Sequence, residues 1–347
     1  MGKIAYKRLK GSEHFRMRLL LSTLSSAPVV IEDIRSDHSI PGLQPHEISF
    51  LRLLEKVSDD CLVEINETGT KLRYKPGILL GGRLPDHDCG VNRSLGYFLE
   101  PLIVLGLYGK KPLSIRLKEG LELKIESRGA APAGGGQVLL SVPAIQKLTA
   151  HTWIDEGMVK RIRGVSYSLK VSSQFENSMI HAARGVFNNL LPDVYIFTDH
   201  RSGPQAGNSP GYGISVVAET TSGCFLSVDT AISHARKDID ETEEDGKELT
   251  PPENVGEQIA SALLEEIAQG GVVDSTHQGL LFLLCALCPP DVSKVRVGKL
   301  SPYGMESLRH IKEFLGVKFV IKPDPSTGTV ILKCVGSGIN NLSRKAF

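Results

Sequence analysis

The sequence predicts a mixed α/β protein with two domains. Helical patterns of apolar residues alternate with short β-branched runs along most of the 347 residues. Between about residues 174 and 270 the order changes to one helix, three strands and a second helix. A chain of this length commonly forms two cores. We therefore expect a large domain of residues 1–173 and 271–347, with a smaller α/β domain of residues 174–270 inserted into it.

The composition is typical of a globular protein, with 41% hydrophobic and 23% charged residues. No run reaches the roughly 18 apolar residues of a membrane helix, and residues 1–8 lack the apolar core of a signal peptide. The cysteines are scattered, which suits a reducing compartment. Cys285 and Cys288 form a C-x-x-C pair, but no second ligand pair lies nearby. We expect a soluble intracellular protein with no metal site and no membrane partner.

The net charge of +1 does not by itself indicate a nucleic-acid ligand, but the positive residues are grouped. Such groups either follow phosphates or form solvated faces, and the sequence leaves both interpretations open. The groups are Lys3, Lys7, Arg8, Lys10, Arg16 and Arg18; Lys160, Arg161 and Arg163; and Lys294, Arg296, Lys299, Arg309 and Lys312. Residues 238–248 carry seven acids and one lysine, which is typical of a solvated acidic loop.

In the first half of the chain, Gly11 and Ser12 precede a helix that carries basic residues in its first turns, a plausible anion site. A strand at 29–31, a loop at 34–47 and a helix at 48–57 follow. Further strands are expected at 62–65, 71–74, 113–117 and 121–127, with an amphipathic helix at 94–107.

Residues 128–136 read RGAAPAGGG and run directly into a β-branched, Leu-rich strand. Three consecutive glycines leave the backbone bare and able to adopt positive φ. Such a loop can cradle an anion with its N–H groups or allow a second segment of chain to approach closely. Taken alone, the glycine run is also compatible with a plain loop before a strand.

In the second half, apolar residues from Phe175 to Leu191 have helical spacing. Strands are expected at 194–198, 214–219 and 225–230, and a helix at 255–268 follows the start signal Pro251-Pro252-Glu253. The chain then returns to the large domain, where Leu300 and Ser301 precede a final helix.

The RGxxPxGGG string followed by a strand resembles the signature of the RNA 3′-terminal phosphate cyclase family. The resemblance extends along nearly the whole chain, through Gly11, Arg16, Leu21 and Ser22, then Arg35, Pro41, Gly42, Leu43 and Pro45, and finally Leu300 and Ser301. It implies a large domain of three repeated units, each with two helices on a four-stranded sheet, together with a smaller inserted α/β domain. It also implies that Arg16, Arg35 and Arg128 bind anions or RNA in one cleft with Gly134, Gly135 and Gly136.

The chain departs from the family pattern where the cyclases bind ATP. The place of the histidine nucleophile is taken by Tyr303, a phenol with a reference pKa of about 10. The other departures are Ser12 and Glu13 in the glycine-rich lead, His38 and Gln44 for two arginines, Glu100 for a glutamine, Glu306 and Ser307 for Thr and Asn, and Gly279 and Leu280 for an Asp-Gln pair. We therefore expect no catalytic residue for cyclisation and no cofactor.

The chain keeps the structural motifs of the family and lacks its catalytic residues. In this it resembles the catalytically inactive, cyclase-like branch of the family. That resemblance implies a factor of small ribosomal subunit biogenesis located in the nucleus and nucleolus. Its implied partners are the small-subunit pre-ribosome, with its pre-rRNA and snoRNP, and a ribosome-assembly GTPase. The basic loops and the acidic residues 238–248 are the possible protein contacts.

Two alternatives remain open from the sequence. One is a pre-rRNA endonuclease on the same scaffold, in which Arg309 and Lys312 share a helix face to hold a phosphate and His310 serves as acid or base. The non-catalytic alternative is that these three residues form a basic surface of the helix. The other alternative is a working cyclase, which would form a covalent adduct with AMP.

Overall fold

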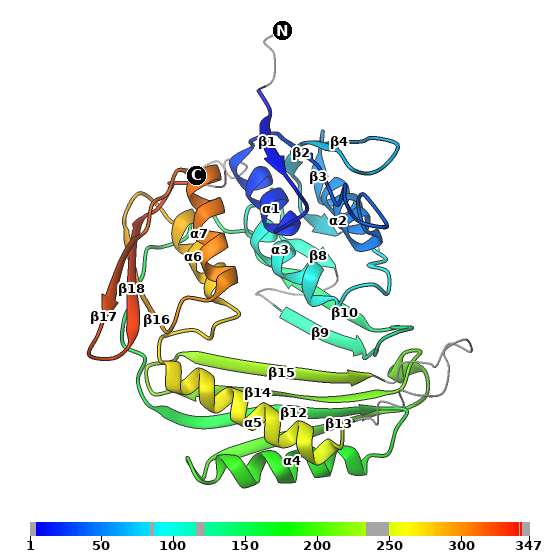
Figure 1. Ribbon diagram of the computed structural model, residues 1–347, viewed down its shortest axis with the longest axis vertical. Helices are drawn as coiled ribbons and strands as arrows, with labels where there is room; N and C mark the ends of the chain where they lie inside the picture. Colours follow the sequence, from blue (N-terminus) through cyan, green and yellow to red (C-terminus); the bar gives the residue numbers. More distant parts are fainter. Residues whose placement is uncertain (1–4, 84–86, 116–121, 234–249, 340, 342–347) are drawn as a thin grey trace.

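The computed structural model describes residues 5–83, 87–115, 122–233, 250–339 and 341. The acidic run at 238–248 lies outside the described residues. Two bodies are visible in Figure 1, a large upper one and a smaller lower one. Each has its own cluster of buried apolar side chains, one formed by residues from 9 to 113, 140 to 142 and 282 to 334, the other by residues from 162 to 263. Separate cores indicate two domains.

The large domain contains three four-stranded sheets of identical design. In each, the first two strands are parallel neighbours, and the fourth strand in sequence lies between the second and the third. The first unit contains β1 (Lys7–Lys10), α1 (Phe15–Ser25), β2 (Val29–Glu32), α2 (Pro45–Val57), β4 (Leu62–Ile65) and β5 (Leu72–Lys75). A two-residue ribbon of β3 (Ser58–Asp59) and β6 (Ile78–Leu79) follows α2.

The second unit contains β7 (Gly82–Arg83), α3 (Gly96–Leu107), β8 (Leu113–Ile115), β9 (Glu122–Ser127) and β10 (Gln137–Val142). Among its described residues it has the single helix α3, and only six residues separate β8 from β9. The third unit contains β11 (Thr152–Trp153), α6 (Gln278–Leu287), β16 (Val292–Val297), α7 (Pro302–Leu315), β17 (Val320–Asp324) and β18 (Thr329–Val335). The repeated sheet order confirms the predicted fold class, except that the second unit has one described helix where two were expected.

The inserted domain is a four-stranded sheet with two helices on one face (Figure 1). Its elements are β12 (Val159–Leu169), α4 (Gln174–Phe187), β13 (Val194–Arg201), the 3₁₀ turn η1 (Gly203–Ala206), β14 (Gly211–Thr220), β15 (Phe225–Ser233) and α5 (Pro252–Gln269). The sheet order is β13-β12-β14-β15, with only β12 and β13 parallel. Alternate residues of the strands, such as Val194 and Ile196, are buried under the helices.

The structure corrects the predicted domain boundary at residue 174. Strand β12 precedes that residue, yet it lies at the centre of the inserted sheet and pairs along its length with β13 and β14. The insertion therefore begins after β11 and interrupts the third unit between its first strand and its first helix. The prediction failed because β12 resembles the other strands in composition, and its pairing partners follow it in the sequence.

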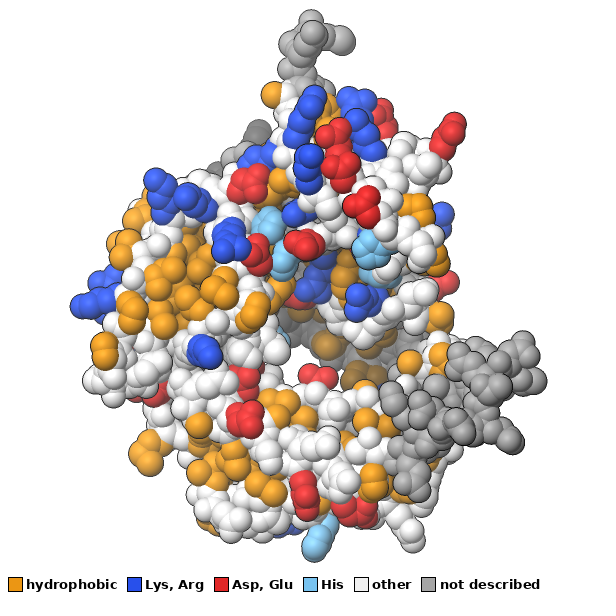
Figure 2. Space-filling view, in the orientation of Figure 1, with side chains coloured by type: hydrophobic (Ala, Val, Ile, Leu, Met, Phe, Trp, Pro, Cys, Tyr) orange, Lys and Arg blue, Asp and Glu red, His pale blue; other side chains and the backbone are white. Residues whose placement is uncertain are grey.

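The inserted domain is attached to the large domain at both ends of its sheet. Where the chain crosses between domains, Asp274 accepts hydrogen bonds of 3.0 Å from the backbone N–H and the hydroxyl of Ser227 on β15. At the other end, the glycine-rich loop of the second unit contacts the loop before β14, where Asn208 N–H donates to the Gly134 carbonyl at 2.9 Å. Figure 2 shows the surface hollowed between the two bodies, with Lys, Arg and His side chains gathered above the hollow and Asp and Glu side chains among them.

Candidate functional site

Tyr303 lies in the first turn of α7, in the large domain. Helix α7 begins where Ser301 caps it, its hydroxyl accepting a hydrogen bond of 3.0 Å from Gly304 N–H. The Tyr303 hydroxyl donates to Glu100 Oε1 on α3 at 3.3 Å and lies 3.5 Å from an Arg16 nitrogen on α1. Arg16 also forms an ion pair with Glu100. One tyrosine, one carboxylate and one guanidinium from three helices thus form a closed cluster.

The cluster does not favour a reactive phenolate. Burial, followed by the nearby Glu100 carboxylate, raises the pKa of Tyr303 above its usual value. Arg16 donates a further bond of 3.0 Å to the Tyr97 carbonyl and lies 5.1 Å from the centre of the Tyr97 ring. The Arg16 charge is therefore already balanced by Glu100, and the phenol stays protonated at neutral pH.

Gly279 on α6 explains how a tyrosine fits at this position. A Cβ atom on Gly279 would lie 2.6 Å from both Tyr303 Cε1 and Ser307 Oγ. These distances are shorter than real side-chain contacts, so a larger residue at 279 and the ring of Tyr303 exclude each other. The two departures that the resemblance places at residues 279 and 303 are sterically coupled in this structure.

Arg35 is held by its own loop rather than left free for a phosphate. Both its terminal nitrogens donate to the Glu47 carboxylate at 2.7 Å, and one also donates to the Gly42 carbonyl at 3.0 Å. The Glu47 side chain is only 3% exposed and also accepts from Gln44 N–H at 2.8 Å, forming a capping box at the start of α2. Arg35 therefore stabilises the loop that leads into α2.

Arg128 connects the two domains. Its Nε donates to Asp199 on β13 at 2.6 Å, its guanidinium lies 4.6 Å from the centre of the Tyr167 ring on β12, and its backbone N–H donates to Gln205 at 3.1 Å. Each of the three predicted anion-binding arginines is thus paired with a carboxylate. That Arg16, Arg35 and Arg128 share one anion-binding cleft stays a prediction.

The glycines of the loop before β10 and of the loop before β14 permit a close approach between these two segments of backbone. The sequence predicted that the Gly134 amide binds an anion. In the structure this amide donates to the Ala130 carbonyl at 2.9 Å, so its N–H is already used. A Cβ on Gly135 would lie 2.9 Å from Gly207 Cα, and a Cβ on Gly207 would lie 2.5 Å from the Gly134 carbonyl oxygen. Of the two roles that the glycine run suggests, the structure shows the close approach of a second segment.

The trio Arg309, His310 and Lys312 is divided by the geometry of α7. Arg309 and Lys312 are exposed, and Arg309 pairs with Glu306 one turn earlier. His310 is 5% exposed, and both its ring nitrogens have partners: Nδ1 lies 2.8 Å from the Glu306 carbonyl, and Nε2 accepts from Arg18 Nε at 3.1 Å. Burial lowers the pKa of His310. A histidine engaged in this way is not placed to exchange protons with an RNA on the exposed face.

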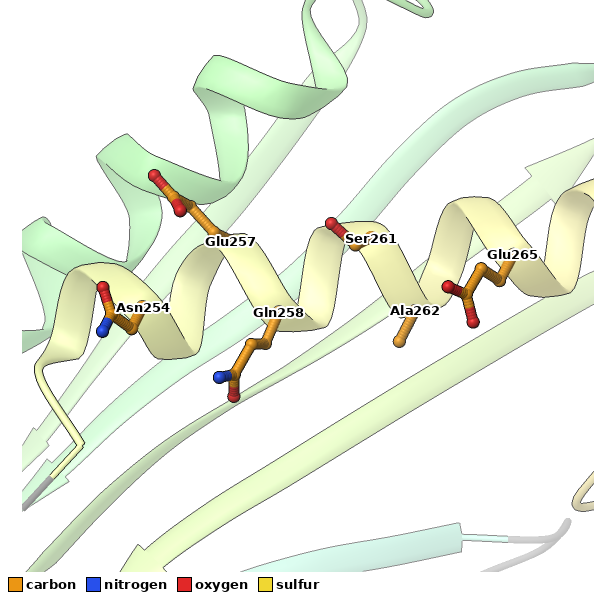
Figure 3. Close-up of a pocket in the computed structure, with 6 residues that line it drawn as sticks. All are labelled: Asn254, Glu257, Gln258, Ser261, Ala262 and Glu265. Atoms are coloured by element: carbon orange, nitrogen blue, oxygen red, sulfur yellow. The ribbon is translucent and has the colours of Figure 1, made fainter.

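The groove along α5 does not offer a phosphate site. A shallow groove of about 530 Å³ runs along α5, but its lining is neutral or acidic and contains no cation (Figure 3). It is lined by Asn254, Glu257, Gln258, Ser261, Ala262 and Glu265. No group of three or more potential metal ligands occurs within the part of the chain that the structure describes. None of the helices there is both long and apolar enough to cross a bilayer.

Comparison with known proteins agrees with this architecture. Residues 7–121 match the family model described as RNA 3′-terminal phosphate cyclase, and residues 154–268 match the model of its insert domain. The second match begins just before β12, as the sheet pairing requires. This chain belongs to the RNA 3′-terminal phosphate cyclase family.

Full-length relatives carry the name cyclase-like. The chain is 61% identical to a probable RNA 3′-terminal phosphate cyclase-like protein of Arabidopsis thaliana, over 99% of both chains. It is 42% identical to the Homo sapiens RNA 3′-terminal phosphate cyclase-like protein, over 96% of both. A relative in Schizosaccharomyces pombe, 37% identical over 98% of both chains, is named an rRNA processing protein. These matches confirm the resemblance inferred from the sequence motifs.

Proposed function

We propose that this protein is a non-cyclase factor of rRNA processing that acts in small ribosomal subunit biogenesis. The observation that supports it best is the closed Tyr303–Glu100–Arg16 cluster, which holds a protonated phenol where the family's nucleophile is expected. The pairing of Arg35 and Arg128 with carboxylates adds to it, because cations already balanced attract a triphosphate weakly. The name of the S. pombe relative supplies the process.

The proposed partners are small-subunit pre-ribosomal particles, with their pre-rRNA and snoRNP, and a ribosome-assembly GTPase, in the nucleolus. A scaffold without its ancestral chemistry acts through what it binds. The exposed basic side chains Arg309 and Lys312 on α7 suit an acidic partner or an RNA phosphate. We do not assign them to an endonuclease, because the buried His310 lacks a free nitrogen for acid–base chemistry.

Depletion and complementation test this function. Cells depleted of the protein should accumulate unprocessed small-subunit rRNA precursors, and the wild-type gene should restore processing. Tagged protein should sediment with pre-ribosomal particles and co-purify with a GTPase. Normal processing in depleted cells, or a protein that sediments away from every pre-ribosomal particle, would contradict the proposal. Purified protein incubated with ATP labelled at the α-phosphate should form no covalent adduct.

A further inference from the structure

The inserted sheet has an open face opposite its helices. Along β13, Val194 and Ile196 are buried beneath α4 and α5, so Tyr195 and Phe197 lie on the other side. Tyr195 is 56% and Phe197 53% exposed. The two rings contact each other edge to face, with centroids 4.5 Å apart. Two large aromatic side chains on one exposed strand face leave considerable apolar surface in water, which commonly marks a binding site.

Arginines flank the two rings. The strand register places Arg163 of β12 directly opposite Tyr195 and Val165 opposite Phe197. Arg161 lies two residues before Arg163 on the same strand face. At the other end of the ring pair, the Asp199 carboxylate accepts hydrogen bonds from both Arg128 and Arg201. The aromatic pair therefore lies between two arginine-containing ends of the same sheet face.

The arginines next to the rings remain accessible. The Arg163 side chain is 37% and the Arg161 side chain 44% exposed, although Arg163 pairs with Asp193 and Arg161 with Glu219. Guanidinium groups at such exposure are screened by water and hold their carboxylates weakly, so a phosphate can compete for them. The two rings on β13 thus lie beside the two arginines on β12, on one face of the sheet.

We propose that this face, defined by Tyr195, Phe197, Arg161 and Arg163, binds single-stranded RNA. Unpaired bases would stack on the two rings, and the RNA backbone would contact the arginines. A four-stranded sheet that presents aromatic side chains on its open face is a recurrent way to hold unstacked bases. Duplex RNA keeps its bases stacked and cannot use the rings. The inference rests on the proposed role in rRNA processing and names the surface that contacts the RNA.

The test is fluorescence anisotropy with a labelled oligouridine of about 12 nucleotides, in the site-size range of such surfaces. Tyr195→Ala/Phe197→Ala should weaken binding at least about tenfold, because each stacked base contributes about five- to hundredfold in affinity. Tyr195→Phe keeps the ring and should remain within about twofold of wild type. Arg163→Ala should reduce the slope of log K against log salt by about 1.

Phe225 offers a matched control. It is as exposed as Tyr195, at 56%, and belongs to the same sheet, but it lies on β15 at the opposite edge, about 14 Å away at the usual strand spacing. Phe225→Ala should leave the affinity unchanged. Thermal melting should show the wild-type transition for all variants, since the substituted side chains lie outside the two apolar cores.

The outcomes separate this inference from the proposed function. If wild-type protein binds the oligonucleotide and the double alanine variant binds equally well, the surface assignment is wrong while the processing role stands. Equal affinity for a duplex of the same length, or no oligonucleotide binding at all, also overturns it. Loss of a protein partner by the double variant with unchanged RNA affinity would reassign the face to that partner. Failure of the depletion test would instead overturn the processing role.

Discussion

Tyr303→Ala would only remove a ring, whereas Tyr303→His tests whether one residue separates this chain from a cyclase. The substitution places an imidazole at the position where the family resemblance predicts the nucleophile. We expect the variant to fold and to form no covalent adduct with AMP. The reason is the surroundings of Tyr303. Its hydroxyl lies 3.3 Å from Glu100 Oε1, and Glu100 is also paired with Arg16, the nearest arginine that could hold a phosphate.

The magnitude follows from the pairing of Arg16 with Glu100. An unpaired guanidinium about 4 Å from a phosphate oxygen would attract it by about 4 kcal/mol at an effective dielectric constant of 20, and the Glu100 carboxylate cancels most of this attraction. That is about a thousandfold in binding or rate. An imidazole beside the same carboxylate would also have its pKa raised, which favours the protonated, non-nucleophilic form. With Arg16 balanced by Glu100, little positive charge remains at this cluster for a triphosphate.

The assay is incubation with ATP labelled at the α-phosphate, followed by denaturing electrophoresis. Tyr303→His should show no label above the wild-type background. The matched variant Tyr303→His/Glu100→Gln removes the carboxylate that neutralises Arg16, keeps its shape and leaves the Arg16 guanidinium unpaired, so any adduct should appear there first. A clear adduct from Tyr303→His alone would show that the pocket positions ATP productively as it stands, and our account of the cluster would be refuted.

Three further predictions concern stability. Gly279→Ala should destabilise by about 1–3 kcal/mol, because its Cβ would lie 2.6 Å from the Tyr303 ring; urea unfolding measures this. Arg35→Ala should cost about 3–5 kcal/mol by leaving the buried Glu47 carboxylate unpaired, seen as a lower melting temperature. His310 has a pKa lowered by burial, so the unfolded chain binds its proton more readily. Wild-type stability should therefore fall as pH drops below about 6.5, and His310→Gln should reduce this slope in melting curves.

Matched variants make these results interpretable. A Cβ added to Gly185 on α4 would have no atom within 4 Å apart from its chain neighbours and the backbone of its own helix, so Gly185→Ala should be neutral or stabilise by up to about 1 kcal/mol. The Arg73–Glu64 pair is about half exposed on both sides, so Arg73→Ala should cost under about 1 kcal/mol. Equal losses from Gly279→Ala and Gly185→Ala, or from Arg35→Ala and Arg73→Ala, would contradict the packing and burial arguments.

The sequence alone predicted the α/β class, most elements and the family. Local patterns carry this information, because apolar periodicity distinguishes helices from strands and a glycine run or a proline marks a specific backbone need. The predicted helix at 94–107, for example, is α3 at Gly96–Leu107. The family was recognised from the RGxxPxGGG string that begins at Arg128 and from Leu300 and Ser301, because motifs that match the family occur along nearly the whole chain.

Only the tertiary structure decided what those residues touch. The partners of Arg16, Arg35 and Arg128 are Glu100, Glu47 and Asp199, separated from them in the sequence by 84, 12 and 71 positions. The Arg35–Glu47 pair lies within one unit and depends on how the loop before α2 folds back on the start of that helix. No local pattern reveals the Arg16 and Arg128 pairs, because each depends on elements from different units or domains meeting. The same holds for β12, whose sheet partners follow it in the chain. Charge neutralisation and strand pairing are long-range properties, so the folded chain decides them.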